Sequence, residues 1–293
     1  MPYNNPHTMK WQGVMPAITT PFREDLSVDH PFLEKHAKWM IENGCTGIVA
    51  LGSLGEGATL ELDEKVAVLQ TCIRAGAPVV AAISALSTQA AVRLAKKAEE
   101  IGCSGLMVLP PYVYSTDWRE MKAHIVAVLR ATKLSCMLYN NPIAYRTDFL
   151  PEQVAELAAE HENLHAVKES AADIRRIAAI RALIDKRLAI FVGVDDLIVE
   201  GIAAGAVGWI AGLVNALPKE SVALFNGADI YHWFLPLLRL DTVPKFVQLI
   251  KLVQAEVGMG NERVRPPRLP LAGEERDSAL GVIRSALAAR PRV

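Results

Sequence analysis

The cysteine patterns that build metal sites or disulfide frameworks are missing from this sequence. The four cysteines, Cys45, Cys72, Cys103 and Cys136, are widely spaced, and no two of them form a Cys-x-x-Cys pair. Neither a zinc site nor a set of disulfides is therefore indicated. We expect buried, reduced thiols in a cytoplasmic protein, with no metal and no cofactor.

A long apolar run and a strong net charge are also absent. No stretch approaches the ~18 uninterrupted apolar residues that a membrane-spanning helix needs. The polar stretch from Met1 to Lys10 has no apolar segment of the kind found in secretory signals. The formal net charge is only -1, so no overall field attracts nucleic acid or an anionic membrane. We expect a cytoplasmic protein that binds neither.

What the chain does have is a regular alternation of apolar runs and helical periodicity. With 293 residues, 51% of them hydrophobic, it can bury a large core. The apolar runs predict strands at 14–20, 47–51, 78–83, 105–109, 135–139, 164–168, 188–193 and 207–212. Helices are predicted at 30–43, 61–75, 89–101, 117–131, 151–161, 174–184 and 197–204.

Eight strand–helix units with continuously apolar strands favour a parallel sheet that is buried on both faces. Eight is the number that closes a (β/α)8 TIM barrel, and a doubly wound open sheet is the alternative. After position 217 only helices are predicted, at 229–240, 243–257 and 277–289. We therefore assign 11–217 to the barrel and 218–293 to a C-terminal helical extension. The basic loop at 263–268 is expected to be a solvated connector.

Lys168 stands at the end of the predicted strand 164–168, directly after Ala166 and Val167. Lysine is rarely fully buried, and an apolar setting favours its uncharged amine. A free amine is a nucleophile that forms a Schiff base with a carbonyl. The ordinary alternative is a lysine at the rim of a strand whose ammonium reaches water. The neighbouring Glu169 points to the opposite face of the strand and is expected to be structural.

The loop Gly52-Ser53-Leu54-Gly55-Glu56 closes the second predicted strand. Its glycines let the backbone turn tightly and present successive N–H groups to an anion, and Ser53 adds a hydroxyl. A small carboxylate can be held there without an arginine. An ordinary strand–helix turn is the alternative.

Other chemically useful residues also fall at predicted strand ends. Tyr139 ends the fifth strand, and its phenol can shuttle a proton. Thr19 and Ile210, after or within the first and eighth strands, are expected at the pocket. Because active sites of barrels gather at the C-terminal ends of strands, these residues should face one mouth together with Lys168. Asp195 and Asp196 follow the seventh strand, and capping of the next helix is preferred to metal binding.

Three segments carry a resemblance to the dihydrodipicolinate synthase / N-acetylneuraminate lyase family of Schiff-base lyases. Gly52 to Glu56 resembles its Gly-x-x-Gly-Glu loop, Tyr139-Asn140-Asn141-Pro142 its Tyr-Asn-x-Pro, and Lys168-Glu169-Ser170 its Lys-Glu-Ser segment. The resemblance implies a TIM barrel that assembles as a homotetramer. It also implies a Schiff base between Lys168 and a 2-oxo acid, with Tyr139 as the acid/base residue and Gly52, Ser53 and Leu54 at the substrate carboxylate.

Within that resemblance the chain departs from the dihydrodipicolinate synthases. They have two threonines where this chain has Ser53 and Leu54, and a tyrosine where it has Val113. Their substrate-reading arginine falls at Ala144, although Arg146 is close. A proton relay through hydroxyls does not run through Leu54 and Val113.

Other stretches resemble the 1-pyrroline-4-hydroxy-2-carboxylate deaminases, among them Trp11-Gln12-Gly13-Val14 and Arg265-Pro266-Pro267-Arg268. The reaction expected from this resemblance is dehydration and deamination of a cyclic imine to 2,5-dioxopentanoate. The alternatives are a 2-keto-3-deoxy sugar acid dehydratase or aldolase, and 4-hydroxy-tetrahydrodipicolinate synthase. Two hypotheses belong to other functional classes. One is a pyridoxal phosphate enzyme, and the other is a non-catalytic sensor of 2-oxo acids.

Overall fold

The computed structural model describes residues 9–111 and 116–293, and within these ranges eight strands form one parallel sheet. The strands are β1 Gly13–Pro16, β2 Ile48–Ala50, β3 Val79–Ile83, β4 Gly105–Val108, β5 Ser135–Asn140, β6 Leu164–Glu169, β7 Ala189–Val192 and β8 Gly208–Ala211. Nearly all of their residues are buried, as expected for strands covered on both faces.

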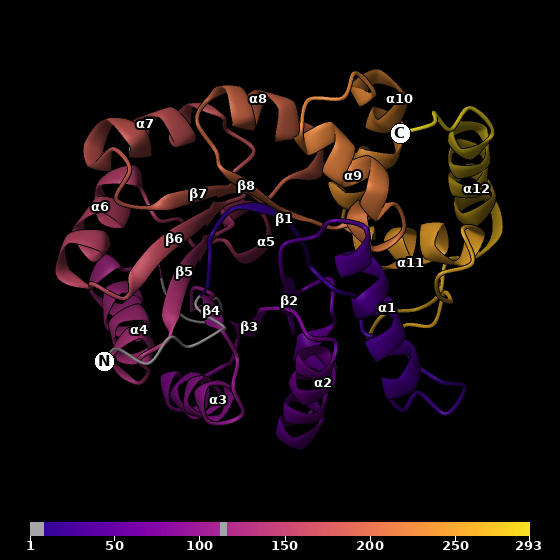
Figure 1. The fold of residues 1–293 in the computed structure, drawn as a ribbon. Helices are drawn as coiled ribbons and strands as arrows, with labels where there is room; N and C mark the ends of the chain where they lie inside the picture. Colours follow the sequence, from indigo (N-terminus) through magenta and orange to yellow (C-terminus); the bar gives the residue numbers. More distant parts are fainter. Residues whose placement is uncertain (1–8, 112–115) are drawn as a thin grey trace.

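The sheet closes on itself. Its strand order is β1-β8-β7-β6-β5-β4-β3-β2, so β1 and β2 are the two ends. Just beyond β1, Ala17 forms a bridge with Val49, and the Ile18 N–H donates to the Val49 carbonyl at 2.9 Å. Figure 1 shows the strands enclosed by helices, and the predicted TIM barrel is confirmed.

Helices follow the strands around the outside of the barrel and continue after the last one. They are α1 His30–Glu42, α2 Leu62–Arg74, α3 Thr88–Glu100, α4 Trp118–Arg130, α5 Pro142–Tyr145, α6 Pro151–Glu160, α7 Arg175–Ile184, α8 Ile198–Ala203, α9 Pro218–Phe225, α10 Tyr231–Leu238, α11 Phe246–Glu256 and α12 Gly273–Ala288. Single 3-10 turns occur at η1 Gly57–Thr59, η2 Asp195–Leu197, η3 Leu213–Asn215 and η4 Arg239–Asp241.

Local sequence explains where several helices begin. The Asp29 carboxylate accepts from the Phe32 N–H at the start of α1, and the Ser87 hydroxyl accepts from the Ala90 N–H at the start of α3. Such caps satisfy amides that have no partner inside the helix. The observed bounds of the predicted helices lie close to the expected ones, but α5 and α9 were not predicted.

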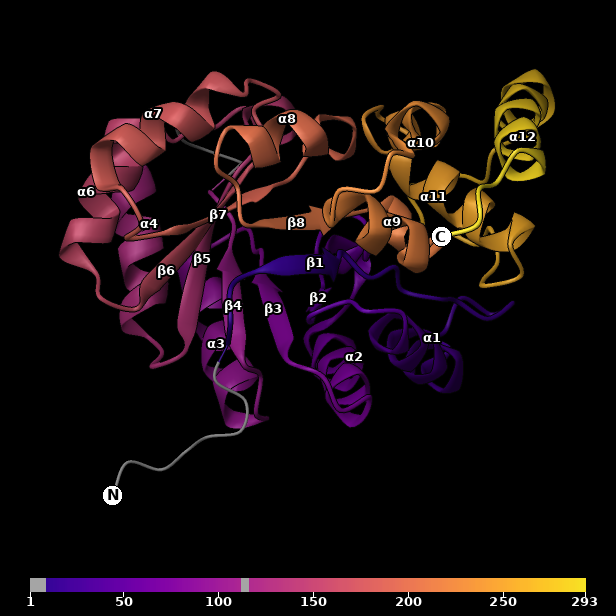
Figure 2. The ribbon, with the colours of Figure 1, turned by 45° about the horizontal axis from the view of Figure 1, so that its top comes forward.

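The C-terminal helices pack beside the barrel. Figures 1 and 2 both place α9 to α12 together, next to β1 and α1, and α9 contacts β1 directly. The division into 11–217 and 218–293 stays a prediction. None of the helices in the described ranges has the length and apolarity that crossing a bilayer would require. The four cysteines are buried and free, and burial raises the pKa of Cys45 to about 12.

The expectation of a solvated connector at 263–268 is wrong. The Arg265 guanidinium forms an ion pair with Glu64 at 2.6 Å and donates to the Leu26 carbonyl at 2.8 Å. The Arg265 N–H also donates to Glu56 Oε2 at 3.0 Å. A basic segment looks solvated in sequence, but here its charges face carboxylates and carbonyls of distant elements.

Candidate active site

Lys168 lies in β6 with its side chain on the inner face of the barrel. Its exposed fraction is 6%, and it pairs in register with Tyr139 of β5 and Phe191 of β7. Paired residues of neighbouring strands point to the same side, so all three face the interior. The Lys168 Nζ lies 4.3 Å from the centroid of the Tyr139 ring. The amine and the phenol that the sequence singles out therefore lie together.

The loop after β2 is compact and strained into its shape. Leu51 and Glu56 have positive φ values of 68° and 52°, which is uncommon for residues with side chains. A Cβ on Gly57 would lie 2.0 Å from the Leu51 carbonyl oxygen, so only glycine fits there. These backbone conformations cost free energy. Contacts elsewhere, chiefly those of the Glu56 side chain, offset that cost.

Glu56 anchors this loop to the C-terminal extension. Its carboxylate forms a fully buried ion pair with Lys251 of α11, with a separation of 2.6 Å. Burial lowers the pKa of Lys251, and the Glu56 charge opposes that shift. In an ordinary first helical turn the Glu56 side chain would reach solvent. Here it is buried and fixes the loop to α11.

The loop also carries two adjacent amides, those of Ser53 and Leu54. Among the described residues, no acceptor is found for the N–H groups of Ser53 and Leu54. Gly52 and the Leu54 side chain are buried. Adjacent unpaired amides in such a turn suit an anion, and a carboxylate is the small anion that 2-oxo acids carry.

Tyr145 is a second phenol at this site that the sequence analysis missed. Its hydroxyl hydrogen-bonds with the Ser53 hydroxyl, and its ring packs edge-on against Tyr139 with centroids 5.8 Å apart. The Asn141 amide donates to the Tyr139 oxygen at 2.9 Å. The available signal is the Asn141-Pro142 pair, because Asn141 caps α5 and Pro142 is its first residue. This short helix places Tyr145 beside the loop.

Glu169 is a buried, hydrogen-bonded residue, as expected for a structural role. It is buried, and it accepts hydrogen bonds from the Asn140 amide at 3.1 Å and the Ala171 N–H at 2.7 Å. Burial raises the pKa of Glu169 to about 7, although these donors oppose the shift.

Asp195 does not cap the helix that follows it, so that expectation is wrong. Its fully buried carboxylate accepts from the Trp209 indole at 3.1 Å and from the Gly212 and Leu213 N–H groups at 3.1 and 2.9 Å. It thus ties η2 to the end of β8. Burial raises the pKa of Asp195 to about 6, and the donors and Lys168 oppose this shift. No cluster of metal-ligating side chains occurs in 9–111 or 116–293.

Ile210 and Thr19, the two other residues predicted at the pocket, are both buried. Ile210 is buried in β8 and pairs with Met15. Thr19 is buried, and its hydroxyl donates to Gln254 at 2.9 Å, so this hydroxyl is already engaged. Their substrate contacts stay predictions. The departure at Val113 lies outside the described residues.

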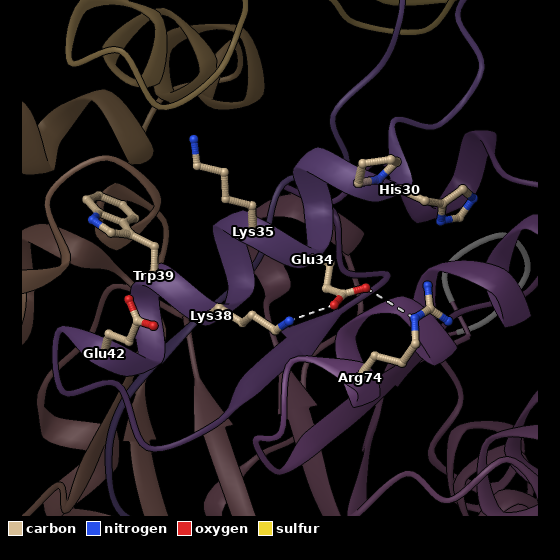
Figure 3. Close-up of a pocket in the computed structure, with 8 residues that line it drawn as sticks. His30, Glu34, Lys35, Lys38, Trp39, Glu42 and Arg74 are labelled. Carbon is tan, nitrogen blue, oxygen red and sulfur yellow. Dashed lines mark hydrogen bonds and ion pairs between the residues drawn. The ribbon is translucent and has the colours of Figure 1, made fainter.

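A surface hollow lies away from these residues. Figure 3 shows it along α1, where Glu34 bridges Lys38 and Arg74. Its lining is charged and open, and it contains none of the residues described above. It does not alter the assignment of the barrel mouth as the candidate active site.

Comparison with known proteins finds one family that matches most of this chain. The model of the dihydrodipicolinate synthetase family matches residues 10–286. The chain is 32% identical over 288 residues to a 4-hydroxy-tetrahydrodipicolinate synthase of Clostridium perfringens, covering 95% of this chain and 98% of the relative. It is 31% identical over 269 residues to the protein of that name from Agrobacterium fabrum, covering 88% and 92%.

Solved structures agree in fold. A dihydrodipicolinate synthase from Bacillus anthracis matches with a TM-score of 0.90 at 27% identity, covering 97% of this chain and 100% of that one. The chloride-inhibited dihydrodipicolinate synthase of Acinetobacter baumannii, complexed with pyruvate, matches with a TM-score of 0.89 at 28% identity, covering 94% and 99%.

Proposed function

Because this chain belongs to the dihydrodipicolinate synthetase family, we propose that Lys168 forms a Schiff base with a 2-oxo acid in the course of a lyase reaction. The observation that carries this proposal is the buried Lys168 amine, 4.3 Å from the Tyr139 ring, on the inner face of the barrel. The pyruvate bound by the Acinetobacter baumannii relative supports the same substrate class.

The chemistry follows from the neighbouring groups. The Lys168 amine adds to the C2 carbonyl, the Tyr139 phenol gives its proton to the departing hydroxyl, and water leaves. The resulting iminium draws electrons from C3, and the Tyr139 phenolate takes the C3 proton to give an enamine. Dividing one hard step in this way is the advantage of covalent catalysis. The Ser53 and Leu54 amides hold the substrate carboxylate.

For the overall reaction, the names of the relatives favour 4-hydroxy-tetrahydrodipicolinate synthase over the deaminase expected from sequence. In the synthase reaction the enamine carbon of pyruvate attacks the aldehyde of aspartate 4-semialdehyde, and Tyr139 protonates the new alkoxide. The amino group of the acceptor then adds to C2 and displaces Lys168. The product is a cyclic imine.

The deaminase is the second candidate, and Leu54 favours it. In that reaction Lys168 displaces the ring nitrogen of a cyclic imine, a proton leaves C3, and the C4 hydroxyl departs as water. Hydrolysis then frees ammonia and 2,5-dioxopentanoate. The buried apolar Leu54 stands where the synthases have a threonine, so the loop offers one hydroxyl fewer.

The test of the proposal is borohydride reduction in the presence of pyruvate. We expect a mass increase on Lys168, and we expect Lys168→Met to lose both the increase and all turnover while its thermal unfolding stays cooperative. Lys245→Met, which alters an exposed ion pair with Glu275, serves as the control. A mass increase on another lysine, or none, contradicts the proposal.

Two assays separate the candidates. The synthase predicts consumption of pyruvate with aspartate 4-semialdehyde and no ammonia. The deaminase predicts ammonia from 4-hydroxy-1-pyrroline-2-carboxylate without added pyruvate. We also propose that the chain assembles as a homotetramer, which light scattering on the purified protein tests, since a monomeric variant is known among the similar structures.

A further inference from the structure

Two glycines open space inside the barrel next to Lys168. Phe191 pairs with Lys168 on one side and with Gly208 on the other, so these residues point to the same face. Every second residue of a strand points to the same face. Gly193 follows Phe191 by two residues and Gly212 follows Gly208 by four, so both belong to that inner face as well.

Polar side chains occupy the space that these glycines leave. A Cβ on Gly193 would lie 1.9 Å from the Ser170 hydroxyl and 2.5 Å from Lys168 Cε. A Cβ on Gly212 would lie 1.9 Å from Asp241 Oδ1. Ser170 and Asp241 therefore reach the inner face at the ends of β7 and β8, beside the amine.

Both of these side chains have a buried polar atom without a partner. Ser170 Oγ and Asp241 Oδ1 find no hydrogen-bond partner among the described residues. Leaving a buried polar atom unpaired is costly, and the great majority of such atoms in folded proteins are paired. Two of them flanking one reactive lysine indicate a missing ligand group.

The surroundings specify the charge of that group. Asp241 enters from η4 in the C-terminal extension. Burial raises the pKa of Asp241 well above its ordinary value, the nearby Asp195 carboxylate raises it further, and Lys168 acts in the opposite direction. The iminium of a Schiff base keeps the single positive charge of the Lys168 ammonium, so two buried carboxyls face one cation at this end of the barrel. A cation that binds beside Asp241 favours its ionised form, whereas a substrate anion would disfavour that form further.

We propose that Ser170 and Asp241 bind the protonated amino group that the substrate carries beyond its Schiff-base carbon. This inference rests on the proposed function and adds the substrate class: 2-oxo acids, or their reaction partners, that bear an ammonium group. Its three N–H donors match the carboxylate and the hydroxyl. The substrate carboxylate binds to the amides of Ser53 and Leu54, and the substrate ammonium binds to Ser170 and Asp241. N–H donors therefore recognise one end of the substrate and acceptors recognise the other.

The experiment compares two acids that differ by the amino group. One is 2-oxopentanoate. The other is 1-pyrroline-2-carboxylate, which gains an amine at C5 when Lys168 opens its ring. The concentration of each that half-saturates borohydride trapping on Lys168 is measured by mass spectrometry. For Asp241→Asn we expect this concentration to rise about 10- to 100-fold for the pyrroline, the range of a charge-assisted hydrogen bond, and to stay unchanged for 2-oxopentanoate.

Two further variants test the second site residue and serve as a control. Ser170→Ala is expected to act in the same direction with a smaller effect. Asp25→Asn is the matched control, because Asp25 is exposed and its carboxylate accepts locally from the Ser27 N–H at 2.9 Å, and it is expected to leave both acids unchanged. Thermal unfolding confirms that each variant is folded.

The outcomes distinguish this inference from the proposed function. An equal change for both acids, or no change in Asp241→Asn, overturns the ammonium site while the Schiff base stands. Failure of the unaltered protein to trap either acid overturns the proposed function and this inference with it.

Discussion

At the scale of single residues, the two tyrosines at the barrel mouth contact different parts of the proposed site. Tyr139 lies against Lys168, whereas Tyr145 bonds the Ser53 hydroxyl in the carboxylate loop. Leu54 has no hydroxyl, and Tyr145 supplies one from within the same chain. We infer that Tyr139 moves protons at the reacting carbons and that Tyr145 keeps Ser53 and the loop oriented.

This division predicts unequal effects on catalysis. Tyr139→Phe is expected to lower kcat by ~10²-fold or more, the usual size of a lost acid/base group. Tyr145→Phe is expected to lower kcat less and to raise KM for the 2-oxo acid. Steady-state kinetics with pyruvate measure both. Tyr231→Phe, whose phenol bonds the Asp196 carbonyl outside the barrel, is the control. Equal losses of kcat in the two mouth variants would contradict the division.

At the scale of elements, the Glu56–Lys251 pair joins the loop after β2 to α11. Lys251 Nζ also donates to the carbonyls of Thr20 and Arg263, at 2.9 and 2.6 Å. All of these partners sit in segments far apart in the chain. The pair thus links the loop that carries the Ser53 and Leu54 amides to α11.

Removal of one partner leaves a buried charge. Lys251→Met is expected to lower the free energy of unfolding by about 3–5 kcal/mol, because the Glu56 carboxylate stays buried without its cation. Urea unfolding measures this loss. The double variant Glu56→Gln with Lys251→Met is expected to lose less than the sum of the single variants. Strictly additive losses would show that the two groups do not act as a pair.

At the scale of the whole molecule, stability in acid depends on a buried histidine. His36 in α1 is fully buried, its Nε2 lies 2.7 Å from the Asn215 carbonyl, and burial lowers its pKa to about 4. The fold therefore favours neutral His36. This contribution is complete above the ordinary pKa of 6.5. It is lost as pH falls toward 4, by up to about 3 kcal/mol.

The measurement is urea unfolding at several pH values for the unaltered protein and for His36→Gln, which keeps a donor but does not titrate. Glu169 and Asp195 act with the opposite sign, because their pKa values are raised to about 7 and about 6. The difference between the two proteins isolates His36. We expect the unaltered protein to lose more stability between pH 6.5 and 4. Parallel pH profiles would contradict this role.

The sequence predicts the barrel well because its strands and long helices carry their own periodicity. β6 and α1 are recognised from neighbouring residues alone. α5 is missed because four residues are too short for a helical pattern. Lys168, Tyr139 and the loop after β2 are recognised as motifs. Tyr145, Lys251 and Asp241 are not, because their partners lie far along the chain and only folding brings them together.

Gly212 and Asp241 constitute one unit of evolutionary change. The carboxyl of Asp241 occupies the volume that any side chain at position 212 would take. A relative with a larger residue there has no room for an acid from η4, so under our proposal it lacks the ammonium site and recognises a different substrate end. The two positions should therefore vary together among relatives. A change of substrate then needs only this exchange at one rim of the barrel, and the strand that carries Lys168 is left intact.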